Sequence, residues 1–284
     1  MGKYKKILAA YDGSPSSQNA LRQAIKLAQT EGCWLKALAV VPSYEGELEL
    51  VGVRNIRELL RGPGQELTAQ AKEIARAEGF DLLTNIEEGE PYERIVEVAS
   101  SYGCDLIVMG RRGRSRLERA LMGSVTARVI GSSKVDVLVV PRDASIGWGR
   151  ILLATDGSEF SRAALQHALN FARSYGGRLL VVSVAVMNEE LLAQAPDVAE
   201  KLTERARAFA QEAQAQAEAQ GVSAQVFVRE GDAHQKIVEV ALKEGADVIF
   251  MGSHGRTGLR KLLMGSVTEK VIGLSACPVL VVRA

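Results

Sequence analysis

Short runs of β-branched and other apolar residues alternate along the chain with longer amphipathic segments. In the first half these runs predict strands near 5–11, 34–41, 82–87, 105–109 and 135–140. Apolar residues at helical spacing between them predict helices near 15–31, 64–78, 91–102 and 124–131. This alternation is typical of βαβ units, whose strands form a parallel sheet with helices on its faces.

The same alternation returns in the second half. Its predicted strands lie near 150–154, 179–185, 224–229, 247–251 and 278–282, and its helices near 160–175, 197–220, 234–244 and 266–273. We therefore expect two tandem doubly wound, Rossmann-like α/β domains. Each is predicted to hold a five-stranded parallel sheet of order 3-2-1-4-5 with four helices. In such sheets ligands bind beyond the carboxyl ends of the strands, where the strand order reverses.

The two halves are copies of each other. The segment Lys6–Ser14, which contains Asp12, recurs as Arg150–Ser158, which contains Asp156. The segment Leu121–Thr126 recurs as Leu263–Thr268. A period this long indicates duplicated domains rather than a solenoid of short repeats. The polar joint 142–149 contains glycine, and the predicted domains are 1–143 and 149–284.

One loop motif occurs in both copies with identical spacing. Met109-Gly110 and Met251-Gly252 end the fourth strand of each copy and open a Gly-x2-Gly-x9-Gly-Ser loop. A glycine at a strand end lets the backbone turn and approach a ligand closely. The final Gly-Ser opens a helix, where free N–H groups and the helix dipole favour phosphate oxygens. Hydroxyl groups of serine and threonine in the first helical turn add further donors.

The loops concentrate positive charge on a chain whose net charge is only +1. Five arginines and one glutamate lie between Gly110 and Gly123, and two arginines and a lysine lie between Gly252 and Gly265. Arginine can contact phosphate with two parallel hydrogen bonds. A solvated basic loop with incidental glycines would explain one such copy, but its recurrence in both favours a phosphate site. The near-neutral total gives no general attraction to nucleic acid or to a membrane surface.

Asp12 and Asp156 follow the first strand of each copy. With the expected strand order, each aspartate faces the same cleft as the glycine that ends the fourth strand. There it could accept hydrogen bonds from an adenine amino group or from ribose hydroxyls. The alternative role is an N-cap of the following helix within Asp-Gly-Ser, and the two roles can coexist.

These motifs, together with the ending Cys277-Pro278-Val279-Leu280-Val281-Val282-Arg283, resemble the universal stress protein family over nearly the whole chain. The intact loop resembles its ATP-binding branch. The resemblance implies that the adenosine is held by Ala10, Tyr11, Asp12, the backbone of Val40, Met109 and Gly110, with Arg111 beside them, and the phosphates by Gly113, Gly123, Ser124, Val125 and Thr126. In the second copy the resemblance implies that the nucleotide is held by the matching residues Ala154, Thr155, Asp156, Val184, Met251, Gly252, Gly255, Gly265, Ser266, Val267 and Thr268.

The first copy departs from the family pattern at two places. Lys134-Val135-Asp136-Val137 replaces the usual Cys-Pro pair, which puts the entry of the last strand in doubt. The segment 42–66 is charged and contains glycines, and it is either a mobile flap over the site or simply a loop. We therefore expect two ATP sites of unequal affinity, with the second closer to the family pattern.

The leading functional prediction is a nucleotide-responsive regulator of the stress response, with ATP as ligand and Mg²⁺ as a companion held mostly by phosphate and water. The alternative is an enzyme, a slow ATPase or another enzyme that uses adenine nucleotides. No Walker Gly-x4-Gly-Lys-Ser/Thr motif is present. His254 lies in the second loop, but the first copy has Arg112 at the equivalent position, so no catalytic residue is predicted. No His–Cys cluster predicts a metal site, and the three separated cysteines read as buried thiols.

The chain shows no apolar stretch near the ~20 residues that a membrane helix needs, and its start lacks the pattern of a signal peptide. We expect a cytoplasmic protein without nucleic-acid or membrane partners. Single-domain family members commonly pair through their last strands. The resemblance therefore implies an internal pseudo-dimer through Val135–Val140 and Pro278–Val282, and a homodimer of chains is a further option.

Overall fold

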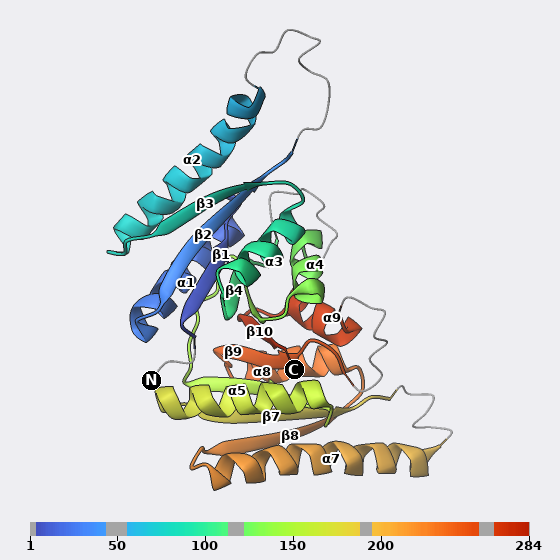
Figure 1. Ribbon diagram of the computed structural model, residues 1–284. Helices are drawn as coiled ribbons and strands as arrows, with labels where there is room; N and C mark the ends of the chain where they lie inside the picture. The colour runs from blue at the N-terminus through green and yellow to red at the C-terminus, as the bar shows by residue number, and fades with distance from the viewer. Residues whose placement is uncertain (1–3, 44–55, 113–121, 188–194, 256–263, 284) are drawn as a thin grey trace. The chain divides into compact units, whose positions relative to one another are not determined.

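The structure, a computed structural model, describes residues 4–43, 56–112, 122–187, 195–255 and 264–283. The chain divides into two compact units, one built chiefly from residues that precede 144 and the other from residues 144–284 (Figure 1). Neither unit contains, within these described ranges, a helix that is both long and apolar enough to cross a membrane.

The first unit alternates strands and helices as expected. Its strands are β1 (Lys6–Ala10), β2 (Trp34–Val41), β3 (Leu83–Glu88), β4 (Leu106–Gly110) and β5 (Asp136–Val140). Its helices are α1 (Pro15–Glu31), α2 (Ile56–Ala77), α3 (Pro91–Ser101) and α4 (Ser124–Ser132).

The second unit repeats the series. Its strands are β6 (Arg150–Ala154), β7 (Arg178–Ala185), β8 (Ala224–Glu230), β9 (Val248–Gly252) and β10 (Val279–Val282). Its helices are α5 (Glu159–Tyr175), α7 (Pro196–Ala219), α8 (Ala233–Lys243) and α9 (Ser266–Leu274).

The strands of each unit are parallel, and the predicted order is confirmed. The first unit has the order β3-β2-β1-β4-β5, and the second has the equivalent order β8-β7-β6-β9-β10. Strands β4, β5 and β9 are buried along their whole length, which explains why they read as continuous apolar runs in the sequence. The order reverses between β1 and β4, and between β6 and β9, so each unit has its crevice there.

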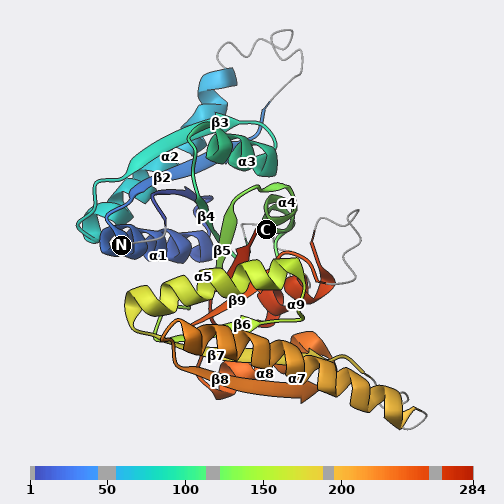
Figure 2. The ribbon, with the colours of Figure 1, turned by 60° about the horizontal axis from the view of Figure 1, so that its bottom comes forward.

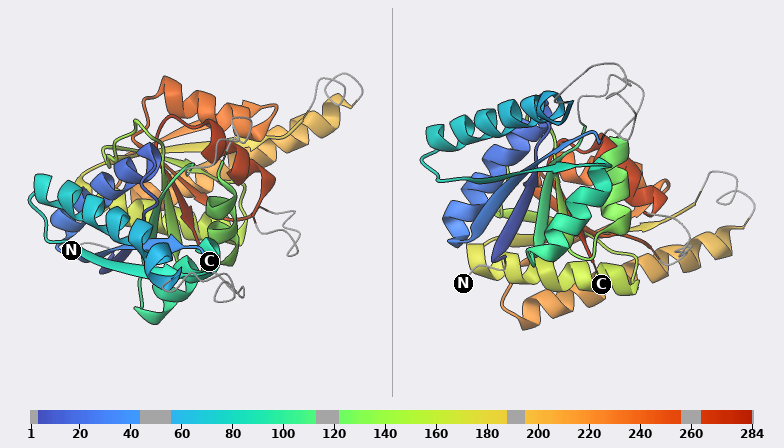
Figure 3. Two further views of the ribbon diagram at one scale, coloured as in Figure 1. Left: turned by 90° about the horizontal axis from the view of Figure 1, so that it is seen from above. Right: turned by 45° about the horizontal axis from the view of Figure 1, so that its top comes forward.

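The helices cover both faces of each sheet. In the first unit α1 contacts α2, and α3 contacts α4; in the second unit α8 and α9 contact each other, and α7 lies along β7 and β8 (Figures 1 and 2). The view from above in Figure 3 shows α2 and α7 as long helices, each in its own unit. These helices follow the second strand of each copy.

Cap residues set the start and end of the first helix in each unit. The Ser14 hydroxyl accepts a hydrogen bond from the Ser17 N–H, and Pro15 occupies the first turn of α1. Ser158 caps α5 in the same way by accepting from Ser161 N–H. Both helices end at a left-handed glycine, Gly32 or Gly176, where the backbone conformation has little cost for a residue without Cβ.

The largest difference from the predicted elements concerns α2. It begins at Ile56 rather than near 64, so residues 56–66 are helix and not loop, while 44–55 of the predicted flap lie outside the described residues. Pro63 stands inside this helix. A Cβ built on Gly64 would lie 2.8 Å from Ile86 Cγ2 and 3.0 Å from Val41 Cγ1, so the helix packs closely on β2 and β3 at that glycine. Tertiary packing thus overrides the breaker signal of Gly-Pro-Gly.

The entry into β5 keeps the geometry of its counterpart despite the missing Cys-Pro pair. Ser133 Oγ accepts from Val135 N–H and donates to the Val135 carbonyl, and Ser275 Oγ makes the same two bonds with Cys277. The buried carboxylate of Asp136 accepts a 2.7 Å hydrogen bond from the Tyr4 hydroxyl. A serine turn, rather than Cys-Pro, therefore sets the entry of this strand.

Candidate functional site

Each predicted loop begins at a glycine whose missing side chain leaves room for a neighbouring helix. A Cβ built on Gly110 would lie 2.7 Å from the carbonyl carbon of Ser16, in the first turn of α1. On Gly252 it would lie 2.8 Å from the carbonyl carbon of Phe160, in the first turn of α5. The sequence predicts that these glycines admit a ligand, but in the structure the close neighbour is the helix. The start of the loop is therefore fixed against the first helix of its unit.

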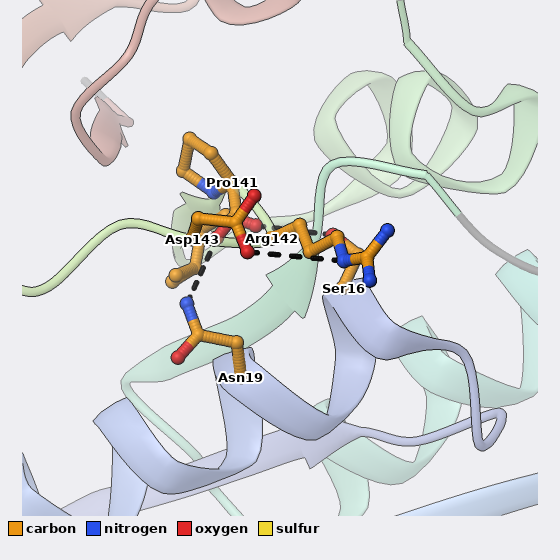
Figure 4. Close-up of polar contacts among 6 residues, drawn as sticks. Ser16, Asn19, Pro141, Arg142 and Asp143 are labelled. Atoms are coloured by element: carbon orange, nitrogen blue, oxygen red, sulfur yellow. Dashed lines mark hydrogen bonds and ion pairs between the residues drawn. The ribbon is translucent and has the colours of Figure 1, made fainter.

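The same turn of α1 is also attached to the end of β5. Ser16 Oγ donates to the Val140 carbonyl at 3.3 Å, and Asn19 Nδ2 donates to the Pro141 carbonyl at 2.9 Å (Figure 4). The ion pair between Arg142 and Asp143 in the same view is exposed, and such pairs contribute little to stability. The first turn of α1 thus connects the ends of β4 and β5.

The Asp-Gly-Ser turn after the first strand has the same geometry in both units. Asp12 Oδ1 accepts from Ser14 N–H at 3.0 Å, and Asp156 Oδ1 accepts from Ser158 N–H at 3.0 Å. The serine, not the aspartate, is the N-cap of the following helix. The other oxygen of Asp156 faces the loop, because a Cβ on Gly255 would lie 2.9 Å from Asp156 Oδ2. One carboxylate oxygen therefore shapes the turn while the other points toward the predicted site.

The far end of the loop is held by backbone and hydroxyl contacts. The N–H of Gly123 donates to the Arg111 carbonyl at 3.0 Å, and that of Gly265 donates to the Ser253 carbonyl at 2.9 Å. Thr126 Oγ1 donates to the Gly110 carbonyl at 3.1 Å and is buried. The sequence predicts that this hydroxyl donates to phosphate, but in the structure its proton is already used within the protein, as it is at Thr268.

The first turns of α4 and α9 remain suited to an anion. Gly123 and Gly265 occupy the N-cap positions, and neither position has a side-chain cap hydrogen bond. The first hydrogen bonds within these helices are donated by Ala127 and Glu269. The N–H groups of Ser124, Val125 and Thr126, and of their counterparts at 266–268, precede those donors and have no partner inside the helix. Such a turn combines converging donors with the positive end of the helix dipole.

In the second unit these parts surround one cavity of about 700 Å³. This volume lies within the range of pockets that hold small molecules, about 300–1,000 Å³. Every residue predicted for the second copy lines it: Ala154, Thr155, Asp156, Val184, Met251, Gly252, Gly255, Gly265, Ser266, Val267 and Thr268. The cavity therefore brings together the turn after β6, the end of β7, the end of β9 and the start of α9.

In the first unit the described residues occupy the matching places on matching elements. Ala10, Tyr11 and Asp12 end β1 or follow it, Val40 lies near the end of β2, and Met109 and Gly110 end β4. Gly123, Ser124, Val125 and Thr126 form the start of α4. Gly113 lies outside the described residues, as do the middle parts of both loops, 113–121 and 256–263. Most of the basic residues predicted to meet phosphate fall in those two segments.

Two arginines of the first loop lie within the described part. Burial lowers the pKa of the Arg111 guanidinium, and the adjacent positive charge of Arg112 lowers it further. Arginine nevertheless stays protonated in proteins. Two neighbouring cations beside the N-terminus of α4 would be stabilised by an anion bound there. The second unit has Ser253 and His254 at these positions, with 3.1 Å between Ser253 Oγ and His254 Nδ1.

Sequence reasoning missed the contribution of α7 to the cavity. Leu202, Arg205, Ala206 and Phe209 of this helix line it, as do Ala233 and Ile237 at the start of α8. The apolar residues of α7 recur at helical spacing, which indicates a face that packs on the sheet. Ala206 does belong to a small core with Ala185, Met187 and Ala199. Periodicity identifies the buried face of a helix but does not reveal that one end of that face borders a cavity.

The described lining of the cavity contains both polar and apolar groups that can contact a ligand. No group of three or more His, Cys, Asp or Glu side chains that could hold a metal ion occurs among the described residues. The His254 ring packs beside the Phe160 ring, with 5.4 Å between their centroids, and it lines the cavity. It is the one titratable ring there within the described residues.

Two α/β units whose crevices lie between the first and fourth strands define a Rossmann-like protein, in which ligands bind beyond the carboxyl ends of the strands. The model of the universal stress protein family matches residues 3–141 and 147–283. The chain therefore belongs to the universal stress protein family, with two domains of that family in one chain.

The chain is similar both to relatives that match nearly its whole length and to shorter relatives that match about half of it. A universal stress protein of Mycolicibacterium smegmatis is 25% identical over 289 residues, covering 98% of this chain and 96% of that one. Universal stress protein MJ0531 of Methanocaldococcus jannaschii is 39% identical over 146 residues, covering 49% of this chain and 83% of its own. A crystal structure of a universal stress protein from Archaeoglobus fulgidus has a TM-score of 0.73 at 23% identity, with coverage of 98% and 96%. That last likeness concerns the fold.

Proposed function

We propose that the chain is an ATP-binding universal stress protein, in which nucleotide occupancy regulates conformation or partner affinity in the stress response. The observation that carries the proposal is the cavity of the second unit, which is lined by all eleven residues that the family resemblance implies for that copy. They come from four separate stretches of sequence, so their meeting at one cavity would be improbable for unrelated residues.

The cavity offers a distinct environment for each part of the nucleotide. Asp156 and the end of β7 supply an acceptor and backbone groups suited to adenine and ribose. The start of α9 supplies backbone N–H donors and the Ser266 hydroxyl for phosphate oxygens. Mg²⁺ would be held chiefly by phosphate oxygens and water, as is usual for nucleotide-bound magnesium. The apolar walls, which include Leu202 and Ile237, would exclude water from the base.

The first unit supports the proposal by the same contacts. Its Asp-Gly-Ser turn, its Gly123–Arg111 bond and its Thr126–Gly110 bond match those of the second unit. Arg111 and Arg112 provide positive charge where Ser253 and His254 lie in the other copy. We therefore propose one nucleotide site in each domain, 1–143 and 149–284, with unequal affinities.

Counting bound nucleotides tests this proposal. Native mass spectrometry of the freshly purified chain should give two ATP molecules per chain. Calorimetric titration with ATP, after the bound nucleotide has been removed, should give the same number. Gly123→Val and Gly265→Val place branched side chains at the start of α4 and α9, and each should remove one site and leave the other. Each variant thus serves as the control for the other. Absence of ATP in the purified chain and of heat on titration would exclude the proposal.

The same samples distinguish a regulator from an enzyme. A regulatory site should retain ATP, with little phosphate released over the time of a titration. Sustained phosphate release over many turnovers within that time, even well below the ordinary enzymatic rate of about 1–10³ s⁻¹, would instead assign the chain to the adenine-nucleotide-using enzymes.

A further inference from the structure

Helix α7 borders the end of the cavity that is remote from the proposed phosphate site. It packs along β7 and β8, whereas the phosphate turn follows β9. In the order β8-β7-β6-β9-β10, β6 and β7 separate β8 from β9. Side chains that α7 directs into the cavity therefore lie at the end where Asp156 and Val184 would hold the nucleoside.

Two of these side chains, Arg205 and Phe209, lie against each other at the cavity wall. Arg205 and Phe209 are four residues apart, so they share one face of the helix. The guanidinium carbon of Arg205 lies 5.7 Å from the centroid of the Phe209 ring, and both residues line the cavity. The ring is held against the Asp-Gly-Ser turn, because a Cβ on Gly157 would lie 2.8 Å from Phe209 Cζ. Phe209 is half-buried and Arg205 is exposed, so both have surface available to a ligand.

The first unit has no such pair at the equivalent positions. Both α2 and α7 end shortly before a left-handed glycine, Gly79 or Gly221, and this register matches Arg205 with Pro63 and Phe209 with Leu67. Leu67 also packs against the turn, since a Cβ on Gly13 would lie 2.7 Å from Leu67 Cδ2. Leu67 is buried, however, and neither Leu67 nor Pro63 presents a planar π surface.

We propose that Arg205 and Phe209 stack on the base of the bound nucleotide, and that this wall gives the second site a preference for purine bases that the first site lacks. The inference rests on the proposed nucleotide site. Aromatic rings and guanidinium planes both stack on bases, and larger purine faces gain more contact than pyrimidine faces. At this end of the cavity the guanidinium of Arg205 contacts the base rather than the phosphates.

The test separates stacking from phosphate binding in the full-length chain. The background variant is Gly123→Val, so that titrations report the second site. The probes are ATP, UTP and inorganic tripolyphosphate. Phe209→Leu copies the first unit and is expected to weaken ATP binding about tenfold, because one base–aromatic stack is worth about 1–3 kcal/mol. Tripolyphosphate affinity should change less than about twofold, and the preference for ATP over UTP should shrink.

Arginine variants provide a matched control. Arg229 lies 5.4 Å from the Phe227 ring on β8 and does not line the cavity, so it forms a comparable pair away from the site. Arg205→Gln should weaken ATP binding, whereas Arg229→Gln should not. Phe209→Tyr keeps a ring and should lose far less ATP affinity than Phe209→Leu. Retained tripolyphosphate affinity in Phe209→Leu shows that its loss of ATP affinity is not due to misfolding.

Three results would overturn the inference. Equal losses for ATP and tripolyphosphate in Arg205→Gln would place that arginine at the phosphates. Unchanged ATP affinity in Phe209→Leu would leave the nucleotide site standing but without a stacking wall. If the wild-type chain binds neither ATP nor tripolyphosphate, the proposed function is overturned, and this inference with it.

Discussion

The hydroxyl of Thr268 donates a 3.0 Å hydrogen bond to the carbonyl of Gly252 and so joins the start of α9 to the end of β9. Thr126 and Gly110 make the equivalent bond at 3.1 Å in the first unit. Both threonines are buried. The two ends of each glycine loop are therefore held together by a direct contact that does not depend on the residues between them.

Replacing Thr268 with valine removes this bond while keeping the shape of the side chain. We expect a loss of about 1–3 kcal/mol in the free energy of unfolding, because a buried carbonyl loses its donor. The start of α9 should also shift relative to β9, so ATP affinity at the second site should fall. Urea unfolding and calorimetry measure the two effects. Thr268→Ser keeps the donor and should recover most of both; equal losses in the serine and valine variants would contradict this role.

Glycine positions within one loop should respond differently to alanine. At Gly110 an added Cβ would meet the backbone of Ser16, which cannot rotate away, so we expect about 1–3 kcal/mol of destabilisation from overpacking. At Gly123 the nearest atom would be the Arg111 carbonyl oxygen at 3.5 Å, and the backbone φ of −69° suits any residue. Gly123→Ala should therefore change the free energy of unfolding by less than about 0.5 kcal/mol. Similar urea midpoints for the two variants would refute this distinction.

Much of this architecture follows from the sequence pattern. The strand and helix positions were predictable because they rest on local periodicity and on the repeat itself, and the strand order followed from the doubly wound fold class. The predicted start of α2 was wrong because Gly62-Pro63-Gly64 is typical of a helix break. In the structure, close packing of Gly64 on Val41 and Ile86 maintains a helix there. Local propensity cannot anticipate such a contact between distant segments.

The candidate site was predictable in its residues but less so in their roles. Loop spacing identified Gly110 and Thr126, yet their partners, Ser16 and the Gly110 carbonyl, depend on how α1 and α4 pack. Arg205 and Phe209 went unrecognised because a cavity wall on α7 has the same periodicity as a core face. Trp148 of the predicted joint likewise packs on Phe171, with 4.4 Å between ring centroids, although the sequence around it is polar.

The cysteines of the first unit should react slowly with alkylating reagents. Burial, followed by the nearby Glu31 charge, raises the pKa of the Cys33 thiol to about 11, and burial with Asp105 raises that of Cys104 to about 11. The thiolate is the reacting species, so at neutral pH both should react about 100-fold more slowly than a free cysteine of pKa about 8.5. Iodoacetamide labelling followed by peptide mass spectrometry measures each rate. Labelling at the free-cysteine rate in the folded chain would contradict the burial.

Tyr4 should make the stability of the chain sensitive to alkaline pH. Its hydroxyl donates 2.7 Å to Asp136 Oδ2, and burial, reinforced by the Asp136 charge, holds its pKa well above the ordinary value near 10. The folded state therefore favours the protonated phenol. This contribution to stability is complete below the unfolded pKa near 10 and declines as the pH rises from there toward the folded pKa.

Tyr4→Phe removes both the bond and the titration. At pH 7 we expect the variant to lose about 1.5–3 kcal/mol in the free energy of unfolding, because the lost hydrogen bond has a charged acceptor. Above pH 10 the wild type should lose stability faster than the variant, so the difference between them should narrow. Urea unfolding at pH 7, 9 and 10.5 measures this. Tyr92→Phe is the control: Tyr92 bonds to Glu93 at the surface, so its removal should change little at pH 7. A constant gap between wild type and Tyr4→Phe across this range would show that Tyr4 does not titrate with unfolding.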